Sequence, residues 1–285
     1  MGPLNGIKIL EFSGIGPGPY CGMLLADLGA DVIRLSRIDQ KGSNNKYDIH
    51  NRSKRSIVAD LKNPKTLIEI RKLIQEMDVI FEGYRPGVME KLGLGPKECL
   101  KLNKSLVYGR MTGWGQDGPM SKRAGHDINY ISLSGALNAI GNESSKPSIP
   151  LNLIGDYGGG GMMLAMGILA AVISSSRTGK GQVIDSAMID GSLSLMSFFY
   201  SLQEMGIWKD KRQSNFLDGA AHFYDTYKCS DNKFIAVGSI EPQFYKILLE
   251  KLELTDPRFN KQMDQSIWQE LKDIIAIKIK SQSRD

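Results

Sequence analysis

The chain has 285 residues, of which 41% are hydrophobic and 24% charged, and its formal net charge at pH 7 is +5. This composition is typical of a folded globular protein, and the length allows one large domain and part of a second. No run of lysine and arginine resembles a nucleic-acid-binding arm, so we expect no nucleic-acid partner. The mild positive charge suits an anionic small molecule, although a basic surface without a ligand explains it equally well.

Three cysteines, Cys21, Cys99 and Cys229, lie far apart and form no CxxC pair. They predict neither a disulfide framework nor a metal site, and they favour a reducing compartment. The N-terminus has no charged segment before a long apolar run, so it predicts a first strand instead of a signal peptide, and a cytoplasmic protein. The most apolar stretch, 162–173, has about 12 residues, which is too few for a membrane span and predicts a buried helix.

Strand and helix patterns alternate over the first 205 residues. A strand over 7–11, a loop rich in glycine and proline, a helix over 20–28 and a strand over 30–35 form a βαβ unit, which predicts a parallel sheet. Further strands are expected at 56–59, 78–81, 106–111 and 183–187, and helices at 65–76, 86–91, 96–102, 156–176 and 189–204. The expected fold class is therefore α/β, with a Rossmann-like, mostly parallel sheet.

A polar, irregular stretch at 206–219 is typical of a linker. It divides the chain into a large α/β domain, 1–205, and a smaller α+β domain, 220–285. In the smaller domain we expect a hairpin with strands at 221–228 and 234–237, followed by helices from about 243 and about 266.

The segment from Ala124 to Tyr130 places His126 and Asp127 at the start of a helical pattern. The chain has three histidines, and only this one lies in such a context. A helix N-terminus favours the neutral imidazole, which can act as a base. A structural histidine is the alternative.

Asp156 begins a second helical pattern and is followed by four glycines, Gly158 to Gly161. A helix-opening aspartate is usually an N-cap. Four glycines, however, cost roughly 1 kcal/mol each relative to alanine, and such a cost marks the close approach of a ligand or of another backbone. An acid and a base at two separate helix starts suit a reaction that uses both faces of one carbon. Glu241 has the simpler alternative of starting the next helix.

Two further patterns are ambiguous. The loop from Gly14 to Gly18 follows the first strand as a dinucleotide fingerprint would, but Pro19 stands where the third glycine is needed, which favours a tight turn. Five basic residues gather near strand ends, and they suit either phosphates or a solvated surface: Arg34, Arg37, Arg52, Lys54 and Arg55.

Several blocks, in order along essentially the whole chain, resemble the family III coenzyme A (CoA) transferases and, within them, the α-methylacyl-CoA racemases. They are EFSGIGPGPYCGMLLADLGADVIR, NRSKRSIVADLK, RPGVMEKLGLGP, GHDINY, PLNLIGDYGGGG, RTGKGQVIDSAM and FYDTYKCSDNKFIAVGSIEPQFY. The resemblance implies the family III fold and an isomerase of lipid metabolism. The enzyme would interconvert (R)- and (S)-2-methylacyl-CoA thioesters by 1,1-proton transfer through an enolate. No metal or cofactor is implied, since CoA is part of the substrate.

The resemblance also implies roles for individual residues. His126 and Asp156 would move the α-proton on opposite faces, and Glu241 would assist the histidine. Arg85 and Lys91 would lie toward the nucleotide. The full set of substrate- or CoA-binding positions is Arg37, Val58, Ala59, Asp60, Leu61, Arg85, Lys91, Gly125, Asp127, Ile128, Asn129 and Tyr130.

Two alternatives stay open. One is a family III CoA-transferase that moves CoA between carboxylic acids with Asp156 as nucleophile, although GHDINY and the glycine run favour the racemase. The other is an acyl-CoA-binding protein without turnover. Family members are longer than this chain and form an interlocked homodimer, so the 220–285 domain is expected to be incomplete and any C-terminal address to lie outside it.

Overall fold

The computed structural model describes residues 2–38 and 45–285. By their contacts these residues form two compact units, each of which is described by itself. The first contains Met1–Ala136 and Pro150–Ser197, and the second contains Leu137–Ile149 and Phe198–Asp285. This division falls before the expected linker at 206–219. It also assigns Leu137–Ile149 to the second unit, where Arg212 donates hydrogen bonds to the carbonyl oxygens of Asn138 and Asn142.

The first unit is built on a six-stranded parallel sheet with the order β3-β2-β1-β4-β5-β6. The expected α/β class and the parallel sheet are therefore confirmed. Because the order reverses between β1 and β4, the sheet has the topology of a dinucleotide-binding fold. The strands are β1 (Lys8–Phe12), β2 (Asp31–Arg37), β3 (Arg55–Ala59), β4 (Val79–Glu82), β5 (Val107–Thr112) and β6 (Gln182–Ala187).

Helices cover both faces of this sheet. Ile9 of β1 belongs to a core shared with α1 and α7, whereas its neighbour Leu10 belongs to a core shared with α2 and α4. Successive strand residues point to opposite faces, so a sheet covered on both sides needs apolar residues at nearly every strand position. The helices of this unit include α1 (Pro17–Asp27), α2 (Pro64–Gln75), α3 (Val88–Lys91), α4 (Pro96–Leu102), α5 (Asp127–Leu133), α7 (Met163–Thr178) and α8 (Met188–Leu195).

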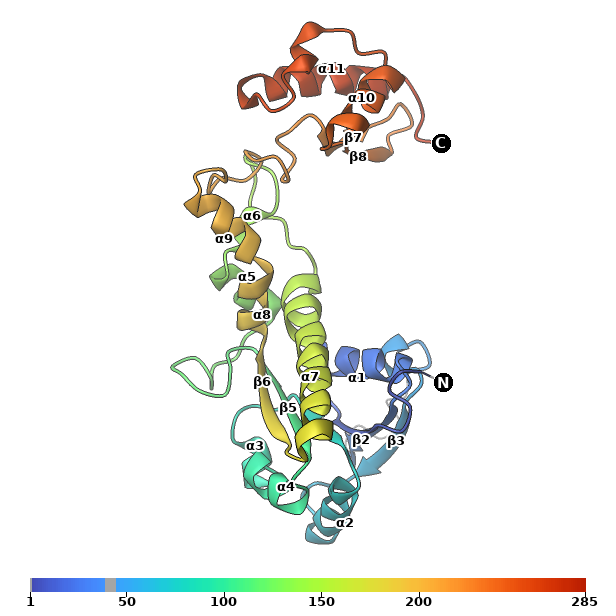
Figure 1. The fold of residues 1–285 in the computed structure, drawn as a ribbon, viewed down its shortest axis with the longest axis vertical. Coiled ribbons are helices and arrows are strands. Elements are labelled where there is room, and N and C mark those ends of the chain that lie inside the picture. The colour runs from blue at the N-terminus through green and yellow to red at the C-terminus, as the bar shows by residue number, and fades with distance from the viewer. Residues whose placement is uncertain (1, 39–44) are drawn as a thin grey trace. The chain divides into compact units, whose positions relative to one another are not determined.

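The helix expected from Asp156 begins earlier and in a different form. A π-helical segment, η3 (Leu153–Met162), precedes α7, which runs beside β5 and β6 (Figure 1). A Cβ on Gly159 would lie 2.7 Å from the backbone nitrogen of Ser192, and one on Gly161 would lie 2.7 Å from the carbonyl oxygen of Pro17. These glycines therefore permit close approach of the α8 and α1 backbones.

The continuous helical run Leu153–Thr178 is long enough to cross a membrane, and an 18-residue window within it has a mean hydropathy of 1.6. This run is longer than the apolar stretch 162–173 noted in the sequence. Its length alone therefore does not distinguish a membrane span from a core helix. Leu164, Ala165 and Ile168 on one side of the helix are buried in the sheet core. Packing in that core explains the apolar composition of this side.

The second unit has its own core and an antiparallel hairpin of β7 (Tyr224–Lys228) and β8 (Phe234–Gly238), as expected. The expected helix 189–204 is divided at Met196, and α9 (Ser197–Glu204) follows. Two longer helices, α10 (Pro242–Lys251) and α11 (Trp268–Lys280), pack on Phe223, Tyr227 and Phe259. The described residues also include four short helical segments: η2 (Ile49–Asn51) in the first unit, α6 (Ala136–Ala139), and η4 (Pro257–Asn260) and η5 (Gln265–Ile267) in the second unit. All three cysteines of the chain are free and buried.

Candidate functional site

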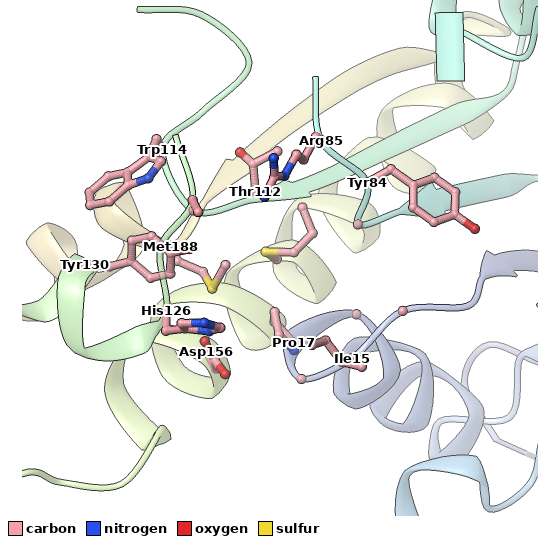
Figure 2. A pocket seen from close by; sticks show the side chains of 18 of the residues that line it. Ile15, Pro17, Tyr84, Arg85, Thr112, Trp114, His126, Tyr130, Asp156 and Met188 are labelled. Carbon is pink, nitrogen blue, oxygen red and sulfur yellow. The ribbon is translucent and has the colours of Figure 1, made fainter. Parts of the chain in front are cut away.

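A cavity of about 600 Å³ lies within the first unit at the carboxyl ends of β1, β4 and β5 (Figure 2). In open α/β sheets this edge, near the point where the strand order reverses, is where ligands bind. The cavity brings together residues far apart in the sequence. Its lining includes Phe12, Gly14–Gly18, Gly83–Pro86, Met111–Trp114, Arg123–His126, Tyr130, Asn152, Asp156, Tyr157 and Met188.

His126 is the N-cap residue of α5 and reaches the cavity from that helix start. Its backbone N–H donates a 3.0 Å hydrogen bond to Oδ1 of Asn129, which fixes the turn. The side chain is exposed and points toward the same space as Asp156 (Figure 2). The predicted helix-start position of His126 is thus confirmed.

Asp156 reaches the cavity from the other helix start, in the first turn of η3. It is not the N-cap, because Asn152 occupies that position and donates through Nδ2 to Asp156 Oδ2 at 3.1 Å. Gly16, with φ of 65°, caps α1, and a Cβ there would lie 3.1 Å from Asp156 Oδ2. The loop between β1 and α1 is therefore a tight turn that lies against this carboxylate.

One wall of the cavity is aromatic and apolar. Tyr130 is buried, and its ring meets Trp114 edge-on with centroids 4.7 Å apart. Burial raises the pKa of the Tyr130 phenol to about 12. A Cβ on Gly113 would lie 2.2 Å from the Tyr130 hydroxyl oxygen, so this wall requires a glycine. Trp114, three residues after the strand expected at 106–111, and Met188, directly after the strand expected at 183–187, were not among the predicted site residues.

The residues of the segment 125–130 lie in different surroundings: some line the cavity, one is buried and two are exposed. Gly125, His126 and Tyr130 line the cavity. Asp127 is buried and accepts a hydrogen bond from the Asp156 backbone instead, whereas Ile128 and Asn129 are exposed. The cavity therefore does not include Asp127, Ile128 or Asn129.

A second cavity of about 430 Å³ lies beside the first, since Tyr84 lines both. It gathers four of the predicted CoA-binding residues, Arg37, Ala59, Asp60 and Leu61. Three other predicted CoA-binding residues lie outside the second cavity. Val58 is exposed on β3, and Arg85 lines the first cavity. Lys91 lies in α3, between two residues that line the second cavity.

The chain's similarity to known proteins identifies the family that has this fold. Residues 4–285 match CoA-transferase family III. The chain belongs to this family.

Relatives within the family carry two kinds of name. The chain is 47% identical to the mouse protein named alpha-methylacyl-CoA racemase and 46% identical to the human protein of that name, over 98% of this chain and 73% of each relative. It is 31% identical to succinyl-CoA–D-citramalate CoA-transferase of Chloroflexus aurantiacus, over 96% of this chain and 72% of that one. The solved CAIB/BAIF family protein from Brucella suis superposes with a TM-score of 0.81 at 29% identity, over 100% of this chain and 80% of that chain.

In this family III chain, buried ion pairs hold the cavity walls. Arg110 on β5 bonds Glu82 Oε1 through Nε at 3.0 Å and Glu90 Oε1 through Nη1 at 2.8 Å. Glu82 also accepts the backbone N–H of Tyr84 at 2.7 Å. Burial raises the pKa of Glu82 to about 7, against the opposing effect of Arg110. This network joins β4, β5 and α3 behind the wall that both cavities share.

A second ion pair explains part of the basic cluster. The Lys54 ammonium is buried, lies 2.6 Å from Glu11 Oε2 and donates to the carbonyl oxygen of Pro19 at 2.9 Å. It therefore holds the start of α1. Arg52 and Arg55 pair with Asp27 and Asp31.

Glu241 lies in the second unit, where it is the exposed N-cap residue of α10 and makes no side-chain cap. This matches the simpler of its two sequence interpretations. The assisting role beside His126 stays a prediction.

Proposed function

We propose that this chain is an α-methylacyl-CoA racemase, an isomerase that interconverts (R)- and (S)-2-methylacyl-CoA thioesters. The observation that carries the proposal is the meeting of His126 and Asp156 in one cavity from two separate helix starts. The relatives of that name at 46–47% identity support it.

The chemistry is a 1,1-proton transfer. One of the two groups begins unprotonated and takes the α-proton, which leaves an enolate of the thioester. The other begins protonated and delivers a proton to the opposite face, so the centre inverts. Backbone N–H groups at the start of α5 stabilise the enolate oxygen. The two groups exchange roles with the hand of the substrate.

The substrate occupies both cavities in this proposal. The thioester and acyl group lie in the first, beside the apolar wall of Trp114, Tyr130 and Met188. The nucleotide part of CoA lies in the second, where the Arg37 guanidinium contacts phosphate. Tyr84 lies at the boundary between the two.

A CoA-transferase is the second candidate, because other relatives, at 31–32% identity, carry that kind of name. There Asp156 attacks the thioester and forms a covalent acyl or CoA adduct. Incubation with a 2-methylacyl-CoA followed by hydroxylamine or borohydride decides between them. The racemase leaves Asp156 unmodified in a mass spectrum of the protein, and a modified Asp156 would establish the transferase instead.

We further propose that the enzyme acts in lipid metabolism in the cytoplasm and needs no cofactor beyond the CoA of its substrate. We also propose that it is a homodimer. Exposed apolar side chains along one side of η3 and α7, those of Met162, Met166 and Ile173, support an interface between copies. Sedimentation at several protein concentrations tests the dimer, and cell fractionation tests the compartment. Activity after dialysis against a chelator tests for a metal, and mass spectrometry of the native protein tests for a bound organic cofactor.

A further inference from the structure

The carboxylate of Asp127 links the two segments that carry the proton-transfer groups. Asp127 is 6% exposed, whereas the neighbouring His126 side chain is exposed and lines the first cavity. Oδ2 of Asp127 accepts a hydrogen bond from the backbone N–H of Asp156 at 2.8 Å. One side chain therefore connects the turn that carries His126 to the turn that carries Asp156.

The helix start that carries Asp156 needs such an acceptor. The first N–H groups of a helix have no partner within it, and the N-cap residue Asn152 forms no side-chain cap. The backbone N–H of Gly155 also favours the ionised form of the Asp127 carboxyl and so lowers its pKa. A carboxylate from α5 thus satisfies one donor of η3 and lies at the positive end of its dipole.

Gly155 shows how closely the two turns approach. A Cβ at this position would lie 2.7 Å from Oδ2 of Asp127 and 3.0 Å from its Cγ, so a side chain here would displace the carboxylate. Burial raises the pKa of the Asp127 carboxyl, and the two N–H groups counter that effect because they favour the ionised form. The close contact therefore requires both a buried acid and a glycine.

We propose that Asp127 is a positioning residue for proton transfer, an inference that rests on the proposed function. It holds the Asp156 backbone against the His126 turn, so that both groups face the same carbon at once. This role differs from the substrate contact that the family resemblance implies for Asp127. A displacement of about 1 Å at such a group can cost up to about 10²-fold in rate.

Two variants test the contact from its two sides. Asp127→Asn removes the charge and keeps the shape, and Gly155→Ala keeps the carboxylate but pushes it away from η3. Asp78→Asn is the control for the loss of a charged acceptor, because Asp78, which is exposed, also accepts a 2.8 Å bond from a backbone N–H, that of Lys8, outside both cavities. The readouts are kcat and KM for α-proton exchange, and backbone amide hydrogen exchange at the start of η3.

We expect kcat to fall about 10- to 100-fold in both variants while KM changes less than about two-fold. Amide exchange at Asp156 should rise in Asp127→Asn, and the control should match the wild type in every readout. A wild-type kcat, a loss seen in KM instead, or unchanged amide exchange would overturn the inference. If Asp127→Asn does not fold, Gly155→Ala decides.

The outcome for the proposed function is separate. A wild-type protein that transfers CoA and exchanges no α-proton would end the racemase proposal. The same comparison of kcat and KM is then made on CoA transfer, in which Asp156 as nucleophile needs the same positioning. The amide-exchange result holds whichever reaction the wild type catalyses.

Discussion

At the scale of single residues, the two central side chains were predictable and their surroundings were not. Chemistry and helix-start context singled out His126 and Asp156, and both line the first cavity. The inward turn of Asp127 was not predictable, because it depends on a contact with a segment 29 positions later in the chain. A carboxylate beside a histidine gives no sequence signal of which one faces solvent.

His126 and Asp156 should be unequal in their effects on the two epimers. His126→Ala should abolish α-proton exchange chiefly from one epimer, and Asp156→Ala chiefly from the other, because each removes the base for one face. The expected loss is about 10²–10⁴-fold. Proton NMR of each epimer in heavy water measures it, and equal losses from both epimers in each variant would contradict separate faces.

Arg37 should contribute to CoA affinity through charge. Arg37→Ala should raise KM for acyl-CoA roughly ten-fold at low salt and flatten the salt dependence of binding, because a guanidinium–phosphate contact is lost. Arg258→Ala is the control, since Arg258 pairs with Asp256 in the second unit and lines neither of the two cavities nor the basic cavity around Arg34 and Arg55. Unchanged affinity in Arg37→Ala would remove this residue from the site.

At the scale of elements, the glycine run illustrates what sequence can reveal and where it stops. Four glycines after Asp156 predicted a close approach, but not whether ligand or backbone approaches. The structure places the α8 and α1 backbones there. The π-helical form of η3 also lay beyond prediction, since its apolar pattern resembles that of an ordinary helix.

Gly191→Ala should separate α8 from η3. A Cβ on Gly191 would lie 1.8 Å from the carbonyl oxygen of Gly159, and backbone atoms cannot move aside as a flexible side chain can. We expect a loss of about 1–3 kcal/mol in the free energy of unfolding, together with reduced activity, because η3 carries Asp156. Urea denaturation measures the first effect. Gly238→Ala, which meets only ordinary contacts, should leave stability nearly unchanged.

At the scale of the whole molecule, strand and helix alternation predicted the α/β class, since continuous apolar strands fit only a sheet covered on both faces. The division of the chain into two units was harder to predict from the sequence. Leu137–Ile149 joins the second unit through contacts with Arg212 that no local pattern encodes. Prediction from local pattern works for elements and fails where distant segments meet.

The second unit should lose stability in mild acid. Burial, together with nearby Lys272, lowers the pKa of His222 to about 4. The histidine therefore binds a proton near pH 6.5 in the unfolded chain but stays neutral at that pH in the folded unit. Stability is therefore full above about pH 6.5 and falls by up to about 3 kcal/mol as the pH drops toward about 4. Urea denaturation at about pH 7 and about pH 5 should show this slope in the wild type and a smaller one in His222→Phe. An identical slope in both would contradict it, and His50→Gln serves as the control because His50 is partly exposed.

The proposed racemase moves an α-proton between the two faces of an acyl-CoA. Incubation of a single 2-methylacyl-CoA epimer with the protein in heavy water, followed by NMR and chiral analysis, tests this activity. We expect deuterium to enter the α-position as the opposite epimer forms. If no α-deuterium enters and CoA moves to a free carboxylate acceptor instead, the proposed racemase function is contradicted.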